Sequence, residues 1–214
     1  MAEKEMNPAA FVAEALADFA TVGAIAPSSR YLTQAMLRPL PLENARLVVE
    51  LGPGTGVMTR ALLNVLPFNA VLLAFEINSR FTRHLKSTIS DSRLVVIDAP
   101  AEALEEELKR RGYRHVDAIL SSLAMGLMSD GERHALLTEI SGCLKKKGTF
   151  TQYQYLHGLQ LRDRQLSKFD MAGLLQLYFR SVQRRIIWRN LPPAFVFSCR
   201  GALAPRTSER KSPQ

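Results

Sequence analysis

Hydrophobic residues gather in short runs along this chain, and the runs alternate with stretches that have helical spacing. The apolar runs fall at residues 47–51, 71–75, 94–97 and 117–120. Runs of this length are consistent with buried strands, and strands that alternate with helices are typical of a parallel sheet. The pattern therefore predicts an α/β fold.

The second half of the chain is predicted to complete a seven-stranded, mostly parallel sheet. Further strands are expected at 149–155, 186–188 and 194–198, with the last two forming an antiparallel, hairpin-like pair. Residues 161–179 have a mixed pattern that favours short helical segments. The expected architecture is Rossmann-like, with helices on both faces of the sheet.

Two helices are expected ahead of the first strand, over 8–20 and 31–37. The apolar face of the first would pack on the core or touch a membrane. Ser28 and Ser29 come just before the second helix, where a hydroxyl suits a helix cap or a phosphate of the substrate. The expected organisation is a helical cap at 1–45, a ligand-binding domain at 46–200 and a flexible basic tail at 201–214.

Composition limits the class of protein. The chain has 214 residues, of which 47% are hydrophobic and 22% charged, as in an ordinary globular domain. No apolar run approaches the roughly 20 residues that cross a bilayer, so we expect a cytoplasmic protein, placed on the inner membrane face if membranes are involved. Cys143 and Cys199 match no metal spacing, and we predict packed free thiols and no metal.

Positive charge is concentrated towards the end of the chain. The net charge is +8, and residues 157–214 hold 11 basic and 3 acidic side chains. Such a segment favours an anionic partner, and a phosphate-rich lipid surface or RNA would qualify. A solvated basic surface explains the same charge equally well. The three lysines at 145–147 are instead predicted to close a helix over 132–144.

A glycine-rich turn with an acidic residue follows the first strand, as Glu50-Leu51-Gly52-Pro53-Gly54-Thr55-Gly56. A dinucleotide fingerprint would read G-x-G-x-x-G, whereas these glycines fall as G-x-G-x-G. Pyrophosphate is drawn to a helix N-terminus because it is anionic. A carboxylate at Glu50 instead suits a ligand with a cationic end, and S-adenosylmethionine carries both an ammonium and a sulfonium.

Two more acids close the next two strands. Glu76 lies twenty positions after Gly56, where an acid can bind the two ribose hydroxyls of a nucleotide, and Asp98 follows the third strand. Because the carboxyl ends of parallel strands meet at one edge of a sheet, Glu50, Glu76 and Asp98 are predicted to surround one site.

These segments resemble the first three motifs of class I S-adenosylmethionine-dependent methyltransferases. The resemblance implies that Asp98 accepts a hydrogen bond from the adenine amino group. It assigns cofactor binding to Glu50, Gly52, Gly54, Thr55, Gly56, Glu76, Ile77, Asp98, Ala99 and Ser121.

Two flanking segments, 22–29 and 188–194, resemble bacterial phospholipid N-methyltransferases that act on phosphatidylethanolamine. The likeness runs from about Phe11 to Cys199.

The turn at 121–125 reads Ser-Ser-Leu-Ala-Met. Nucleobase amino-methyltransferases typically carry Asn/Asp-Pro-Pro-aromatic or Asn-Leu-Pro-Tyr here, so that a ring stacks on the flipped base. The absence of both features argues against a nucleobase. Ala124 also departs from the proline-containing, serine-rich turn of the phospholipid subgroup. The similar run at 190–193 is interpreted as a turn between late strands.

The candidates for chemistry lie at the end of the fifth predicted strand. An amine attacks the methyl group only when it is unprotonated, so a base or a desolvated site is needed. Tyr153 and Tyr155 could also stabilise a methylated ammonium through cation–π contact. The catalytic candidates are Tyr153, Tyr155 and Ser121, and the substrate-binding candidates are Ser28, Ser29, Tyr31 and His157.

The favoured hypothesis is N-methylation of an amino-phospholipid head group at a membrane surface. One alternative is an enzyme like the rRNA adenine dimethyltransferases, and RNA is the less favoured partner because the base-binding motif is missing. The other alternative is a module that binds S-adenosylmethionine without turnover.

Overall fold

The computed structural model describes residues 29–155, 159–162 and 165–203. The helix expected over 8–20, the candidates Ser28 and His157, and the tail from 204 onwards lie outside these ranges.

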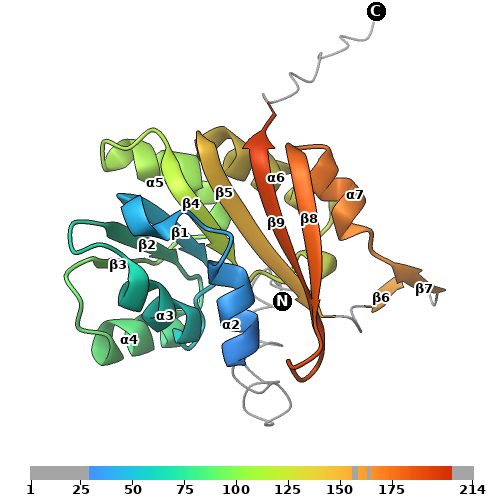
Figure 1. The fold of residues 1–214 in the computed structure, drawn as a ribbon, viewed down its shortest axis with the longest axis horizontal. Coiled ribbons are helices and arrows are strands. Elements are labelled where there is room, and N and C mark those ends of the chain that lie inside the picture. Colours follow the sequence, from blue (N-terminus) through green and yellow to red (C-terminus); the bar gives the residue numbers. More distant parts are fainter. Residues whose placement is uncertain (1–28, 156–158, 163–164, 204–214) are drawn as a thin grey trace, which may run out of the picture.

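A seven-stranded sheet forms the centre of the molecule, in the order β3-β2-β1-β4-β5-β9-β8 (Figure 1). Strands β1 to β5 are parallel, whereas β9 runs antiparallel to both β5 and β8. The Rossmann-like fold with an antiparallel C-terminal pair is therefore confirmed. The strands are β1 (Leu47–Leu51), β2 (Val71–Phe75), β3 (Leu94–Ile97), β4 (Val116–Ser121), β5 (Leu144–Tyr155), β8 (Phe179–Ile187) and β9 (Ala194–Ala202).

Helices cover both faces of this sheet. Residues of α2 and α3 pack on one face, and residues of α5, α6 and α7 pack on the other. The helices are α2 (Arg30–Leu37), α3 (Val57–Val65), α4 (Ser79–Thr88), α5 (Leu104–Arg110), α6 (Asp130–Cys143) and α7 (Met171–Gln176), with short 3-10 turns at Leu42–Asn44, Ala101–Ala103 and Met125–Leu127. None of the helices described is long and apolar enough to span a bilayer.

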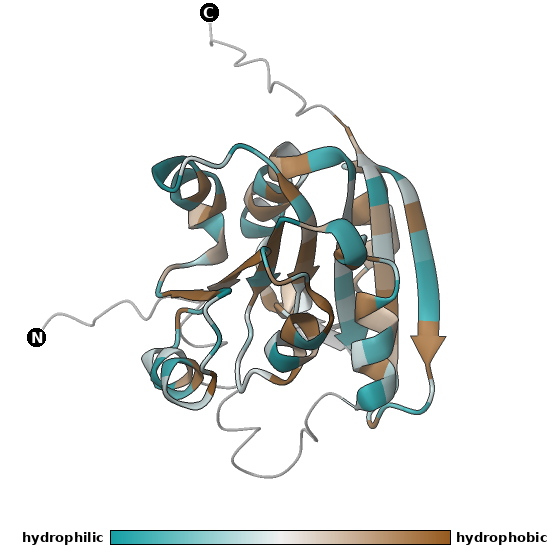
Figure 2. Cartoon of the chain, turned by 60° about the vertical axis from the view of Figure 1, so that its left-hand side comes forward, coloured by the Kyte–Doolittle hydropathy of each residue, from teal (hydrophilic) through white to brown (hydrophobic). Residues whose placement is uncertain are grey.

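Alternation along β1 explains the two-sided core. Val48 packs with α2 and α3, whereas Val49 and Leu51 pack with α5 and α6, because successive side chains of a strand point to opposite faces. The central strands are accordingly hydrophobic along their length, and the outer surfaces of the helices are hydrophilic (Figure 2). Cys143 and Cys199 are buried free thiols, as predicted.

The late part of the chain differs from the prediction. Strand β8 begins at Phe179 rather than near residue 186. The segment 161–179, expected to be helical in parts, does contain α7, but a hairpin of β6 (Leu159–Arg162) and β7 (Gln165–Lys168) precedes that helix. The middle of β8 reads Gln183-Arg184-Arg185 and is exposed at the sheet edge, so the sequence lacks the alternation that marks a half-buried strand.

The triple lysine also lies elsewhere than predicted. Helix α6 ends at Cys143, and residues 145–147 belong to β5, where all three side chains are exposed. Leu144 pairs with Val116 of β4, so backbone pairing extends the strand through a sequence that resembles a helix end. Strand β9, which runs antiparallel to β5, continues to Ala202, so the first two residues of the predicted tail are part of a strand.

Candidate active site

The glycine turn follows β1 and depends on a close approach of the backbone. The Gly52 N–H donates to the Phe75 carbonyl of β2 over 2.9 Å. Gly52 has a φ of 73°, and a Cβ there would lie 2.9 Å from Cδ2 of Leu123. Glycine adopts this left-handed backbone without strain, whereas any other side chain would also have to displace the Leu123 side chain. The sequence thus keeps a side-chain-free surface where β1 meets α3.

Glu76 closes β2 beside this turn and is held by backbone amides. Its Oε2 accepts from the Gly54 N–H at 3.0 Å, and its Oε1 accepts from the Asn78 N–H at 2.9 Å. Burial raises the pKa of Glu76, while these backbone hydrogen bonds oppose the rise. The carboxylate is therefore fixed in position, and each oxygen keeps a lone pair for a ribose hydroxyl.

The other predicted cofactor residues lie at the same edge of the sheet. Ile77 follows Glu76 and is 38% exposed. Asp98 and Ala99 follow β3, and the Asp98 side chain is exposed. Thr55, within the glycine turn, is exposed as well. Because β3, β2 and β1 are neighbouring parallel strands, these residues lie together at the edge formed by the carboxyl ends of the strands.

Glu50 is a buried carboxylate without a partner. It is fully buried, and neither of its oxygens has a hydrogen-bond partner within the described part of the chain. Burial raises its pKa to about 7; the nearby Thr59 hydroxyl opposes this rise, although no hydrogen bond of normal geometry joins the two. An uncompensated buried carboxylate favours a cation nearby, and the ammonium of S-adenosylmethionine would provide one. Together with the glycine turn and Glu76, Glu50 makes this edge a good fit for that cofactor.

The turn after β4 is held by Ser121, a candidate from the sequence, and by Gln152, which the sequence did not single out. Ser121 is fully buried, and its Oγ accepts from the Leu123 N–H at 3.3 Å, so its hydroxyl closes its own turn. Gln152 of β5 pairs with Ser121 in register, and its Nε2 donates to the Leu123 carbonyl at 2.9 Å. The sequence carried no distinct signal for Gln152, because threonines and a second glutamine lie close to it in the same strand.

Arg133 anchors the next part of this loop from α6. Its guanidinium is buried and donates to the carbonyls of Met125 at 3.1 Å and Met128 at 2.6 Å. It also lies 4.4 Å from the ring centre of Phe169. A buried arginine at the start of a helix carried no recognisable signal in the sequence, because its carbonyl partners are known only from the fold.

Tyr153 and Tyr155 lie on the same face of β5, as the alternation predicted. Their ring centres are 5.3 Å apart at an interplanar angle of 75°, and both rings pack with the α2 and α3 side of the core. Burial raises the pKa of both phenols, most strongly at Tyr153. The pair therefore offers neutral aromatic rings in a desolvated place at the carboxyl end of β5.

Helix α2 joins this face to the β8–β9 turn. The Ser29 hydroxyl caps α2 by accepting from the Leu32 N–H at 3.3 Å, and the Ser29 N–H donates to Asn190 Oδ1 at 3.1 Å. Asn190 is buried in the turn after β8. The Ser29 hydroxyl thus takes the cap role, one of the two expected for it, and residues 190–193 form a turn as predicted.

Tyr31 lies between two guanidinium groups. Nη2 of Arg30 donates to its hydroxyl at 2.8 Å, and Cζ of Arg189 lies 5.2 Å from its ring centre. The hydrogen bond from Arg30 lowers the pKa of this phenol. Tyr31 packs with the same side of the core as Tyr153 and Tyr155. The structure therefore gathers three of the predicted tyrosines on one face of the sheet.

The comparisons with known proteins agree with this geometry. Residues 48–148 match the family model described as "Methyltransferase domain". The chain is 26% identical over 185 residues to the ornithine lipid N-methyltransferase of Singulisphaera acidiphila. The alignment covers 84% of this chain and 88% of the relative.

Solved methyltransferases share the fold. The 1,6-didemethyltoxoflavin-N1-methyltransferase of Burkholderia thailandensis, solved with S-adenosylhomocysteine, aligns over 96% of this chain and 94% of its own, with a TM-score of 0.61 and 17% identity. Human methyltransferase-like protein 13, also in complex with S-adenosylhomocysteine, aligns over 82% and 80% with a TM-score of 0.57 and 20% identity. The matched domain and the shared fold make residues 48–148 a methyltransferase domain of the class that uses S-adenosylmethionine.

Proposed function

We propose that this enzyme methylates the amine of a membrane amino-lipid head group, such as phosphatidylethanolamine or ornithine lipid. The observation that carries the proposal is the similarity to an ornithine lipid N-methyltransferase across most of both chains. The two lipids share a primary amine on a membrane-embedded molecule. The proposed reaction is therefore N-methylation of a lipid amine, and the experiment below identifies the head group.

The cofactor side of the site is assigned to the edge formed by β1, β2 and β3. When bound, S-adenosylmethionine supplies an electrophilic methyl group for in-line transfer to the acceptor. Glu50 would balance the ammonium of the cofactor, Glu76 would accept from the ribose hydroxyls and Asp98 would accept from the adenine amino group. The buried, unpartnered carboxylate of Glu50 supports this assignment.

The acceptor side is assigned to Tyr153 and Tyr155. A desolvated place disfavours the ammonium form of an amine, so a larger fraction of the acceptor keeps its lone pair. Burial raises the pKa of both phenols, so they stay protonated and serve poorly as bases. Their rings would instead stabilise the positive charge that each methylation leaves on nitrogen.

The turn at 121–125 favours a lipid amine over a nucleobase. It contains no aromatic ring to stack on a flipped base, and its polar groups are engaged within the protein. An aliphatic amine needs no stacking platform. The turn thus lacks the aromatic ring that the rRNA adenine hypothesis requires.

The test is transfer of radiolabelled methyl from S-adenosylmethionine by the purified full-length protein. Four acceptors are compared side by side: vesicles with phosphatidylethanolamine, vesicles with ornithine lipid, vesicles of phosphatidylcholine and phosphatidylglycerol, and total RNA. The third mixture is the matched control, because it presents a phospholipid surface without a free amine.

Label in either amine-bearing lipid supports the proposal and identifies the head group. Label in RNA but in none of the lipids would overturn it. Cofactor binding by calorimetry with no label in any acceptor would favour a module without turnover.

A further inference from the structure

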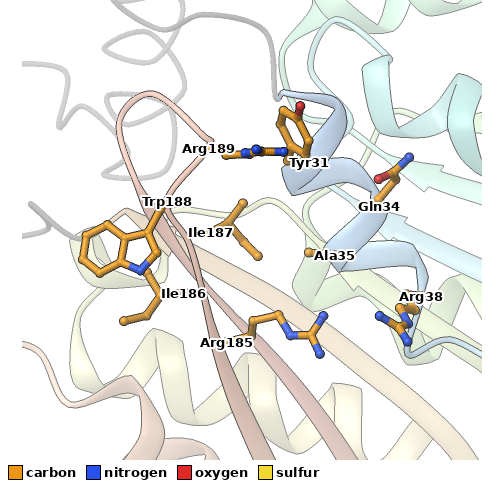
Figure 3. Close-up of a pocket in the computed structure, with 9 residues that line it drawn as sticks. All are labelled: Tyr31, Gln34, Ala35, Arg38, Arg185, Ile186, Ile187, Trp188 and Arg189. Atoms are coloured by element: carbon orange, nitrogen blue, oxygen red, sulfur yellow. The ribbon is translucent and has the colours of Figure 1, made fainter.

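A groove of about 450 Å³ lies between α2 and the end of β8, apart from the cofactor residues (Figure 3). Its two walls come from segments about 150 residues apart in the chain. The lining residues are Tyr31, Gln34, Ala35, Arg38, Arg185, Ile186, Ile187, Trp188 and Arg189.

The groove carries positive charge without compensating carboxylates. Arg38, Arg185 and Arg189 line it, and none of them forms an ion pair with a carboxylate in the described part of the chain. Neither 29–41 nor 171–203 contains a single aspartate or glutamate. The local charge therefore selects an anionic partner.

Exposed apolar side chains lie next to these arginines. Trp188 is 69% exposed and Leu191, in the turn between β8 and β9, is 79% exposed. In Figure 3 the Trp188 indole points away from the groove, on the side opposite to α2. Strand β8 is hydrophilic in its middle and hydrophobic at its end (Figure 2). Tryptophan beside arginine is typical of a surface that rests in the head-group region of a bilayer.

The sheet register places this surface beside the predicted acceptor site. Tyr155 of β5 pairs with Ala194 of β9, and Ala194 pairs with Ile187 of β8, which lines the groove. Neighbouring strands are about 4.8 Å apart, so two steps separate Tyr155 from the groove by roughly 10 Å along the sheet. A lipid bound at the groove would thus lie close to the reacting end of β5.

We propose that the β8–β9 turn docks on an anionic phospholipid surface, with Trp188 and Leu191 entering the head-group region and Arg38, Arg185 and Arg189 binding lipid phosphates. The arginines of β8 would also discourage edge-to-edge pairing of this outer strand. That role needs charge only, whereas membrane docking also explains the exposed tryptophan and leucine. Membrane binding at this surface can be measured without cofactor and without methyl transfer.

Trp188 makes the test site-specific, because it is the only tryptophan in the chain. Its fluorescence is measured while full-length protein is titrated with vesicles of phosphatidylcholine containing 30% phosphatidylglycerol, and with pure phosphatidylcholine as control. We expect a blue shift with the anionic vesicles, and quenching by lipids brominated near the head group.

Charge-matched variants distinguish vesicle binding at this groove from a general attraction of the positively charged protein to anionic lipid. Arg38→Gln with Arg185→Gln removes two groove arginines, and we expect vesicle partitioning to weaken about 30-fold. Arg114→Gln with Arg184→Gln removes the same charge outside the groove lining, and Arg184 lies on β8 next to Arg185. We expect less than a threefold loss for this control pair. Circular dichroism verifies that both variants are folded.

Three results would overturn the proposal. The first is vesicle sedimentation without any change in Trp188 emission, since the membrane would then contact another surface. The second is an equal loss of binding in the two double variants. The third is a Trp188 response to single-stranded RNA with none to anionic vesicles.

Discussion

The backbone N–H of Gly54 donates a 3.0 Å hydrogen bond to Oε2 of Glu76, which lies 22 residues further along the chain. This bond ties the turn after β1 to the end of β2 and fixes how the two motifs face each other. Gly54 itself has a φ of 54°, and a Cβ placed on it would meet no atom within 4 Å. A side chain at Gly54 would therefore extend into open space on the cofactor edge.

The variant Gly54→Arg is predicted to abolish S-adenosylmethionine binding while leaving the fold intact. Its control is Gly112→Arg, because Gly112 also has a positive φ, of 78°, and open space around its Cβ. Each substitution should cost about 1–2 kcal/mol of stability from the left-handed backbone. Calorimetry should show cofactor binding in the Gly112 variant alone. Equal affinity in both variants would refute the placement of the cofactor at Gly54.

Asp98→Ala is predicted to weaken cofactor affinity about tenfold or more, because the adenine amino group would lose its hydrogen-bond acceptor. Asp98→Asn keeps an oxygen at the same place and should retain most of the affinity. Calorimetric titration with S-adenosylhomocysteine measures both. An Asn variant as weak as the Ala variant would mean that charge, rather than a hydrogen bond, is what Asp98 supplies.

Glu50→Gln is predicted to change how stability depends on pH. Burial raises the pKa of Glu50 from 4.5 to about 7, so between these values the folded protein holds its proton more tightly than the unfolded chain. Stability from this group is complete below pH 4.5 and is lost as the pH rises through 7. Relative to the wild type, the variant should therefore gain roughly 2–3 kcal/mol between pH 5 and pH 8. Urea unfolding at both pH values measures the difference in stability between the variant and the wild type. A difference that does not change with pH would contradict the prediction.

Tyr155→Phe and Tyr155→Ala separate the ring from the hydroxyl. The phenylalanine variant keeps the aromatic face and should retain methyl transfer to within about threefold, whereas the alanine variant should lose roughly 10- to 30-fold in kcat/KM. The assay is the radiolabelled transfer into the amine acceptor. If the phenylalanine variant is as impaired as the alanine variant, the hydroxyl takes part directly and the cation–π role is wrong.

Arg133→Met is predicted to destabilise the protein by about 3 kcal/mol, because the carbonyls of Met125 and Met128 lose their buried donor. Arg114→Met is the control: Arg114 is exposed, and its loss should change stability by less than about 0.5 kcal/mol. The midpoint of urea unfolding compares the two. Equal midpoints would show that the loop after β4 does not depend on this guanidinium.

The cofactor edge could be predicted from the sequence because its signals are local. A glycine turn after one strand and an acid at the end of the next two each lie within a few residues of a strand that can be recognised by its apolar run. Parallel packing then brings Glu50, Glu76 and Asp98 to one edge without any further information.

Tyr153 and Tyr155 could also be named from the sequence, but the contacts that hold the loop after β4, and the groove, could not. Gln152 and Arg133 act on carbonyls whose positions follow only from the packing of β4, β5 and α6. The groove joins Arg38 to Arg185, residues from distant parts of the chain that meet because α2 packs against β8 and β9 of the sheet (Figure 3). Strand β8 was underestimated for a related reason, because an exposed edge strand loses its hydrophobic alternation.

The reversed direction of β9 has a consequence for substitutions in the β8–β9 turn. Because β9 runs antiparallel to β5, the β8–β9 turn returns to the same edge at which the parallel strands end. Most of the predicted cofactor residues lie at or just after the ends of β1, β2 and β3, while this hairpin lies at the opposite end of the strand order. Substitutions in the β8–β9 turn are therefore expected to alter membrane docking, the role proposed for this turn, and to leave the affinity for S-adenosylmethionine unchanged.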